Sequence, residues 1–225
     1  MTVIAIDGPA GSGKSTVARA VAARLGLDYL DTGAMYRAVA FEAIRRGIDP
    51  EDAPTVAELA RQLELTVEDK VTVNGADATV EIRSPEVTRA VSIVAANPEV
   101  RQEMVLRQRE WAATHGGGVV EGRDIGTVVF PDALLKVYLT ASENERAGRR
   151  SREMLERRFD QTAADMALVA HEIARRDRLD STRAASPLTV AEDAVKVDTT
   201  GIDAGQVVQR VMDLVAERMH GEGDG

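Results

Sequence analysis

A glycine-rich segment near the start of the chain limits the possible folds more than any other feature. The segment Gly8–Ser15 fits the pattern G-x-x-x-x-G-K-[ST]. It follows an almost wholly apolar, β-branched stretch, Thr2–Asp7, and leads into a helical stripe of apolar residues over Lys14–Leu25. A buried strand, a tight glycine turn and an amphipathic helix form the context in which this pattern binds phosphate. The segment therefore predicts an α/β core with an anion-binding loop at one edge of its sheet.

The loop is expected to bind ATP together with Mg²⁺. Its glycines let the backbone wrap closely around an anion, with N–H groups pointing inward and the positive end of the helix dipole behind them. Lys14 should reach the β- and γ-phosphates, Ser15 should offer its hydroxyl to Mg²⁺, and Thr16 should lie at the α-phosphate. The predicted ATP-binding residues are Gly8, Pro9, Ala10, Gly11, Ser12, Gly13, Lys14, Ser15 and Thr16.

Short apolar runs recur along the chain and predict the rest of the sheet. They cover Leu27–Leu30, Val119–Glu121, Leu134–Leu139 and Ala194–Val197. With the first strand they give about five strands, most of them parallel, in a doubly wound sheet. The stretches 63–68, 71–74 and 77–82 instead alternate apolar and polar residues, and Asn74-Gly75 favours a tight hairpin. A small antiparallel meander is therefore expected as an insertion.

Several residues carry the signals of helix starts. Thr55 with Glu58, and Ser142 with Glu145, have the spacing of capping boxes. Ser84-Pro85 and Asn97-Pro98 place a capping residue before a proline at the first helical position. A last helix is expected to start at Asp203.

Composition excludes several function classes. The formal charge is 28 − 37 = −9 and the pI is near 5.0, so no nucleic-acid partner is expected. Charged residues interrupt every apolar run, so no membrane span is expected. The chain has no cysteine, its three histidines lack metal-ligand spacing, and no charged-then-apolar leader opens it. These features favour a cytoplasmic enzyme without disulfides or thiolate zinc sites.

The residues after the other strands distinguish between classes of P-loop protein. A GTPase should carry an Asn-Lys-x-Asp segment, and the chain has none. A motor or transporter ATPase would end a hydrophobic strand in Asp, often followed by Glu. Here Val119-Val120 leads to Glu121-Gly122-Arg123-Asp124, an order that indicates a second substrate pocket. A small-molecule kinase fits best.

The second substrate should lie between the loop after the second strand and a basic lid. Strand ends share one edge of a doubly wound sheet, so Asp31–Arg37 should face the P-loop. In this segment Thr32 could hold a phosphate or hydroxyl, Tyr36 could pack on a ring, and Arg37 could clamp a phosphate. Arginines also cluster after the fourth predicted strand and again near 175–183, which favours phosphate clamps. The members of these clusters are Arg146, Arg149, Arg150, Arg152, Arg157, Arg158, Arg175, Arg176, Arg178 and Arg183.

Four strings closely resemble the bacterial cytidylate kinase family, and the likeness covers residues 2–219. The strings are Ile6–Ser15, Leu30–Arg37, Glu121–Ala133 and Arg176–Leu188, and the segment Gly-Arg-Asp-Ile-Gly-Thr-Val-Val-Phe-Pro-Asp-Ala is the most specific. The resemblance implies a five-stranded parallel core in a single P-loop kinase domain, 1–225. It also implies an inserted nucleoside-monophosphate lobe at about 35–112 and a helical lid at about 146–178.

The resemblance also implies roles for particular residues. Ser92, Arg101, Arg123 and Asp124 would line the cytosine and phosphate pocket, Asp180 and Arg183 would reach the sugar, and Arg37 and Arg176 would hold phosphate. With Thr32 and Tyr36 these form the expected CMP-binding set. The catalytic set is Lys14, Arg123 and the lid arginines Arg146, Arg149 and Arg150. Many members have Asp where this chain has Glu121, whose carboxylate is expected near Mg²⁺ through water.

The chemistry of the bases supports this assignment. Cytosine offers an exocyclic amine donor and an N3 acceptor, which suit a carboxylate and an arginine. Uracil reverses this pattern, so Asp124, with Arg101 and Ser92, should discriminate between the two. The expected reaction moves the γ-phosphoryl of ATP onto CMP or dCMP, giving CDP or dCDP and ADP in a monomeric enzyme. The alternatives are a P-loop kinase acting on UMP or a hydroxy-acid, and a P-loop module that binds nucleotide without turnover.

Overall fold

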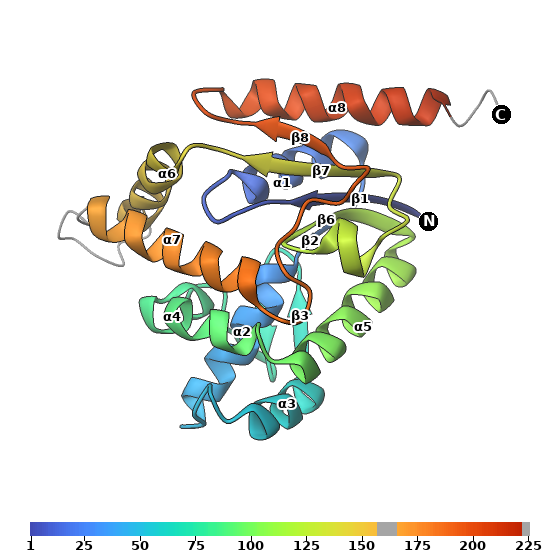
Figure 1. Ribbon diagram of the computed structural model, residues 1–225. Coiled ribbons are helices and arrows are strands. Elements are labelled where there is room, and N and C mark those ends of the chain that lie inside the picture. The colour runs from blue at the N-terminus through green and yellow to red at the C-terminus, as the bar shows by residue number, and fades with distance from the viewer. Residues whose placement is uncertain (157–165, 222–225) are drawn as a thin grey trace.

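The computed structural model describes residues 1–156 and 166–221 and is built around a five-stranded parallel sheet (Figure 1). The strands are β1 (Thr2–Asp7), β2 (Tyr29–Asp31), β6 (Gly117–Gly122), β7 (Leu135–Thr140) and β8 (Val195–Asp198). Their order is β2-β6-β1-β7-β8, and every neighbouring pair is parallel. The predicted doubly wound sheet is confirmed, with β1 and its P-loop at the centre.

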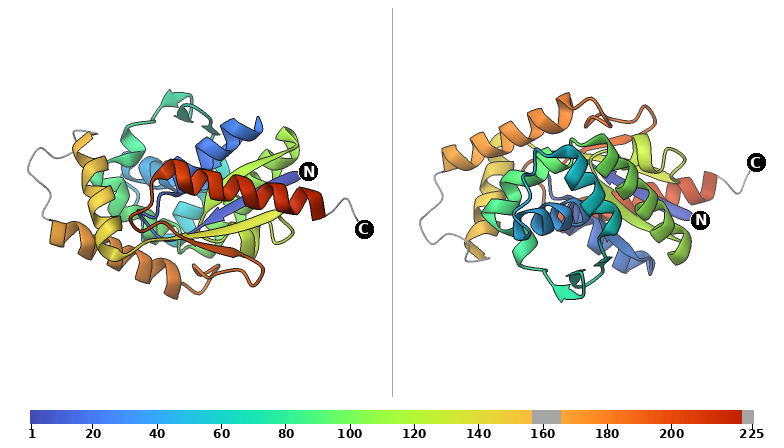
Figure 2. Two further views of the ribbon diagram at one scale, coloured as in Figure 1. Left: turned by 90° about the horizontal axis from the view of Figure 1, so that it is seen from above. Right: turned by 90° about the horizontal axis from the view of Figure 1, so that it is seen from below.

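The alternation of side chains along β1 explains why both faces of the sheet are covered. Ile4 and Ile6 belong to a core shared with α1 (Lys14–Leu25) and α8 (Ala204–Gly221). Val3 and Ala5 point to the opposite face and belong to a second, larger core. The long helix α8 lies along the first face above β7 and β8 (Figures 1 and 2).

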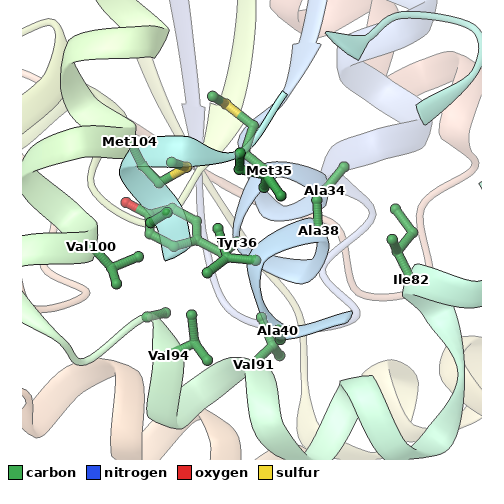
Figure 3. Packing of buried hydrophobic residues seen from close by; sticks show 14 of the residues in the cluster. Ala34, Met35, Tyr36, Ala38, Ala40, Ile82, Val91, Val94, Val100 and Met104 are labelled. Atoms are coloured by element: carbon green, nitrogen blue, oxygen red, sulfur yellow. The ribbon is translucent and has the colours of Figure 1, made fainter. Parts of the chain in front are cut away.

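The chain between β2 and β6 packs around the second core. It forms a separate lobe below the sheet in Figure 1. Its main helices are α2 (Thr32–Arg45), α3 (Ala53–Gln62), α4 (Pro85–Val94) and α5 (Pro98–His115). Tyr36 of α2 packs among Val94, Val100 and Met104 from the last two of these helices (Figure 3). This packing fixes the start of α2, and with it the segment that follows β2.

The predicted antiparallel meander is present but shorter than expected. It contains β3 (Leu65–Val67), β4 (Val71–Val73) and β5 (Ala76–Asp77) in the order β3-β4-β5. The expectation of strand over 78–82 was wrong. Ala78 still donates its N–H to the carbonyl of Val71, at 2.9 Å. Beyond it, Thr79 hydrogen-bonds Asp77, and the Thr79 hydroxyl accepts the backbone N–H of Val71, so the backbone ladder ends at Ala78. The chain then turns through a short 3₁₀ helix, η1 (Glu81–Arg83), back toward the sheet.

Helix starts follow the sequence signals with one exception. Ser84 and Asn97 cap α4 and α5, and the Ser142 hydroxyl accepts from Glu145 N–H at the start of α6 (Glu143–Glu156). The prediction of a capping box at Thr55 was wrong. Asp52 caps α3, and its carboxylate accepts the N–H and the hydroxyl of Thr55. An acceptor three residues earlier in the chain therefore outcompeted it.

Two further helices, α6 and α7 (Met166–Thr182), form a third layer of the molecule. Helix α6 packs against α7, and α7 in turn touches α4 of the lobe. The middle of the predicted lid, 157–165 with Arg157 and Arg158, lies outside the described residues. In the two described ranges no helix is both long and apolar enough to cross a membrane.

Candidate active site

The P-loop lies at the carboxyl end of β1, and its first glycine has no room for a side chain. Gly8 has a φ of +148°, and a Cβ there would lie 2.1 Å from the carbonyl oxygen of Leu139. Lys14 is buried and donates from Nζ to the carbonyl of Pro9 at 2.8 Å. Burial, together with the charge of Arg123, lowers the pKa of Lys14 to about 7. A polyphosphate placed in this loop would restore the lysine's charge.

One cleft of about 730 Å³ joins the P-loop to α2, α4, the end of β6 and the α6–α7 pair. Of the expected site residues, those that line it are Ala10, Gly11, Lys14, Ser15, Thr32, Tyr36, Arg37, Ser92, Arg101, Glu121, Arg123, Asp124, Arg150, Arg176, Asp180 and Arg183. Segments up to 170 positions apart in the sequence therefore converge on one hollow. Arg146 and Arg149 do not line it.

Asp124 lies at one end of the cleft, in a buried cluster of charges. Its Oδ2 accepts a hydrogen bond from Arg101, and its Oδ1 lies 3.6 Å from Nη2 of Arg183. Arg101 also donates to the carbonyl of Ala95 at 3.1 Å, and its guanidinium lies 5.3 Å from the ring centre of Tyr36. Tyr36 thus packs beneath an arginine. Oδ1 of Asp124 therefore has the weaker protein contact.

Arginines gather in the middle of the cleft, where burial disfavours their charge. The pKa of Arg37 is lowered by burial first and then by the charges of Arg176, Arg150 and Arg83. Burial and Arg123 lower the pKa of Arg176 to about 10. Burying like charges together costs free energy, and a bound anion would offset that cost. The arrangement therefore fits a phosphate group that bridges these cations.

Unpartnered donors in the same region support this interpretation. The Nε of Arg176 and the Nη2 of Arg183 are buried and, among the described residues, form no hydrogen bond. Each faces a carboxylate only at ion-pair distance, 3.9 Å to Oδ2 of Asp180 and 3.6 Å to Oδ1 of Asp124. Buried N–H groups without partners are costly, so such groups indicate a place for a ligand or water. Both donors belong to residues that line the cleft.

Arg83 is a cleft residue that the sequence did not reveal. It lines the cleft, and its Nη2 lies 3.0 Å from Oδ2 of Asp31, the N-cap of α2. It lies between the stretch 77–82, which was expected to be strand, and the helix start expected at Ser84-Pro85, so the sequence assigned it no structure. The 3₁₀ turn at η1 aims it toward the other arginines.

Asp180 is connected to the P-loop through Arg123. Arg123 donates from Nε to Asp180 at 2.8 Å and from Nη1 to the carbonyl of Gly8 at 2.7 Å. Burial would raise the pKa of Asp180, but the charges of Arg123 and Arg176 outweigh burial and lower it. Arg123 therefore touches both halves of the site.

The three lid arginines have different partners. Arg146 pairs with Asp177 of α7 and donates to the carbonyl of Ala10 at 3.1 Å, while Asp177 accepts the N–H of Ala10 at 3.0 Å. Arg149 donates to the hydroxyl and carbonyl of Thr199 beyond β8 at 2.8 and 2.7 Å. Arg150 lines the cleft and pairs with Glu153 at 2.8 Å. Two of the three thus brace the P-loop region, and Arg150 faces the cleft.

The carboxylate of Glu121 lies between the P-loop and β2. Burial and the charge of Asp31 raise its pKa, while Lys14 and hydrogen bonds from Tyr29 and Ser15 lower it. Thr32 donates its hydroxyl to the backbone carbonyl of Glu121 at 2.6 Å rather than pointing to a ligand. The described residues contain no cluster of three or more His, Cys, Asp or Glu suited to a metal. A serine hydroxyl and carboxylates nonetheless fit Mg²⁺, which binds few protein groups and keeps water and phosphate as ligands.

A parallel sheet with a central P-loop, and a cleft that runs from this loop to a cluster of arginines, are typical of P-loop kinases. A gluconokinase from Sinorhizobium meliloti shares this fold, with a TM-score of 0.50 and 16% identity over 96% of this chain and 92% of that one.

The sequence comparisons place the chain within one kinase family. The profile of the family described as cytidylate kinase matches residues 4–217. Cytidylate kinases from Mycobacterium leprae and Geobacillus kaustophilus are each 50% identical to this chain. The alignments cover 96% of both chains for the first, and 96% of this chain and 97% of the relative for the second. The chain belongs to the cytidylate kinase family, the group that its four sequence strings resemble, and is a nucleoside-monophosphate kinase.

Proposed function

We propose that this enzyme transfers the γ-phosphoryl group of ATP to CMP and dCMP, giving CDP or dCDP and ADP. The observation that carries the proposal is the single cleft in which a P-loop faces Asp124, Arg101 and a buried arginine cluster. ATP would bind along the P-loop, and the acceptor would place its base at Asp124 and its phosphate among Arg37, Arg83 and Arg176. In this pose the γ-phosphate of ATP and the single phosphate of the acceptor would meet near Lys14.

The acceptor phosphate requires no general base. Its second pKa is near ~6, as for phosphate esters generally, so at neutral pH it is already a nucleophile. The cleft accordingly contributes alignment and charge. Lys14, Arg123 and Arg150 would neutralise charge on the transferring group, and an arginine in this role contributes roughly 10³-fold or more in rate. Arg146 and Arg149 would act through the position of the P-loop.

Mg²⁺ would be held by the Ser15 hydroxyl and, through water, by Glu121. When bound, it neutralises phosphate charge and orients the phosphate oxygens. Tyr29 supports this arrangement, because its hydroxyl binds Glu121 and fixes the longer carboxylate against the loop.

The base pocket favours cytosine through Asp124. Its Oδ1 would accept from the exocyclic amine, and uracil would present a carbonyl oxygen to the same carboxylate. Ser92, buried on α4, and Arg101 would contact the remaining ring atoms. Asp180 and Arg183, which also line the cleft, would contact the sugar.

We further propose a cytoplasmic, monomeric enzyme with lobe boundaries near 35–112 and 146–178. The lid pair α6–α7 touches both the P-loop and α4, so two bound nucleotides would draw the lobes together. Closure of this kind would exclude water, the competing acceptor.

A nucleotide panel tests the proposal. ADP release is coupled to a spectrophotometric readout with ATP, Mg²⁺ and either CMP, dCMP, UMP, AMP or a hydroxy-acid, and chromatography identifies the product. CDP from CMP, at a kcat/KM well above that for UMP, is expected. A preference for UMP or a hydroxy-acid would replace the acceptor assignment, and nucleotide binding without turnover would indicate a binding module.

A further inference from the structure

A buried carboxylate at the end of β1, outside the cleft lining, holds the loop that carries Asp124. Asp7 is the last residue of β1 and immediately precedes the P-loop. It is buried, and it does not belong to the cleft lining. Its Oδ1 accepts the N–H of Ile125 at 2.9 Å, and its Oδ2 accepts the N–H of Gly126 at 2.8 Å. These two residues directly follow Asp124.

The local backbone explains why these two bonds matter. Asp124 begins η2 (Ile125–Val129), a single π-helical turn whose first N–H groups have no partners within the turn. The carbonyl of Asp124 accepts from the N–H groups of Val128 and Val129. At the start of the turn, the Asp7 carboxylate accepts the free N–H groups of Ile125 and Gly126. Both ends of the turn that carries Asp124 are thereby fixed.

The loop is also tightly packed, so its position depends on small distances. A Cβ on Gly122 would lie 2.6 Å from Cδ1 of Ile125, and one on Gly126 would lie 3.0 Å from Cδ of Lys136. Gly122 pairs directly with Asp7 across the β1–β6 ladder. The loop is thus confined by the ladder at its start and by the Asp7 carboxylate and the Lys136 stem near Gly126.

The charge state of Asp7 is compatible with this role. Burial raises its pKa to about 6, against the lowering effect of the two N–H bonds. The carboxylate is therefore largely ionised at pH 7.5 and accepts both bonds at once.

We propose that Asp7 is a positioning residue for acceptor specificity: it holds the turn at Ile125 and Gly126 so that Asp124 presents Oδ1 to the base. This inference rests on the proposed recognition of cytosine by Asp124. It assigns to the strand before the P-loop a part in choosing the acceptor. Donor binding, which uses the loop beyond Gly8, would not depend on it.

The substitution Asp7→Asn tests the inference. The amide keeps one acceptor oxygen but turns an NH₂ group toward the second backbone N–H, so donor faces donor and the turn shifts. We expect the ratio of kcat/KM for CMP to that for UMP to fall about tenfold, the effect of losing one hydrogen bond to a charged group. Calorimetry should show unchanged affinity for a non-hydrolysable ATP analogue. Asp203→Asn is the matched control, because Asp203 likewise accepts a backbone N–H, from Gly205 at 2.7 Å, on distant α8.

A double-mutant cycle separates positioning from a general structural role. If Asp7 acts through Asp124, the double variant Asp7→Asn/Asp124→Asn should discriminate no less than Asp124→Asn alone. Additive losses, or an Asp7→Asn protein that melts earlier but keeps the wild-type ratio, would overturn the inference. If Asp7→Asn does not yield folded protein, Asp7→Ser, which can accept one bond without a fixed opposing donor, is measured by the same criteria.

The cycle also distinguishes this inference from the function on which it rests. A wild-type enzyme that does not prefer CMP to UMP would refute the proposed function. A wild-type enzyme that prefers CMP, together with a folded Asp7 variant that keeps the full preference, would refute the role of Asp7 alone.

Discussion

Replacing Asp124 with asparagine should change which base the enzyme accepts. The Asp124 and Arg101 side chains are 6% and 4% exposed, so the arginine keeps an acceptor rather than turning to water. In Asp124→Asn the amide oxygen should stay with Arg101, and the NH₂ group would then occupy the place of Oδ1. That group would face the amine of cytosine as donor against donor. For uracil, which has a carbonyl oxygen there, it would be complementary.

The size of the effect follows from the bond exchanged. Loss of a hydrogen bond to a charged group costs about 1.5–3 kcal/mol, which lowers kcat/KM for CMP by about 10- to 150-fold. A new neutral bond to uracil contributes about 0.5–1.5 kcal/mol and raises the value for UMP by about 2- to 10-fold. The CMP/UMP ratio should therefore fall by roughly 20- to 1,500-fold.

Steady-state kinetics on both acceptors at saturating ATP measures this ratio. Thermal melting and the affinity for an ATP analogue check that the fold and donor site survive, with Asp203→Asn as the control for loss of one carboxylate. A folded Asp124→Asn enzyme with the wild-type CMP/UMP ratio would remove Asp124 from base recognition.

Three further outcomes are expected. Burial lowers the pKa of Lys14 in the free enzyme to about 7, and bound phosphate should raise it. Binding of an ATP analogue at pH 8 should therefore be accompanied by net proton uptake, measured by calorimetry in buffers of different ionisation enthalpy. Equal uptake by Lys14→Met would contradict the assignment. Arg37→Met should weaken CMP binding at least about tenfold. It should also raise the melting temperature of the free enzyme, since burial and neighbouring cations disfavour the Arg37 charge. An unchanged CMP affinity would exclude Arg37 from the phosphate site. ATP hydrolysis without CMP should be negligible in a phosphate-release assay, and rapid release by purified enzyme would refute closure on both nucleotides.

The sequence predicted the sheet because its signals are local. A buried parallel strand is continuously apolar, and the P-loop pattern combines a strand end, a turn and a helix start within 15 residues. The strand at Thr2–Asp7 and the helix at Lys14–Leu25 could therefore be read directly from the sequence. The 3₁₀ turn at η1 could not, because the bonds of Thr79 to Asp77 and Val71 depend on the meander already being folded.

The sequence predicted which residues line the site more readily than it predicted the contacts between them. Asp124, Arg101 and Arg183 come together as expected, but no sequence pattern indicates that Tyr36 lies under Arg101 or that Thr32 donates to a strand carbonyl. The contacts of Asp7 and Asp177 span more than 110 positions of sequence. Such pairings form only when the sheet brings distant strand ends to one edge.

Calorimetric titration tests the central claim that one cleft holds two nucleotides with their phosphates facing each other. CMP is added to enzyme already saturated with a non-hydrolysable ATP analogue and Mg²⁺. The account predicts that one CMP binds to each chain, at least as tightly as in the absence of the analogue, and that the analogue remains bound. If CMP instead displaced the analogue, or failed to bind while it was present, the two nucleotides would share a single site and the account would be wrong.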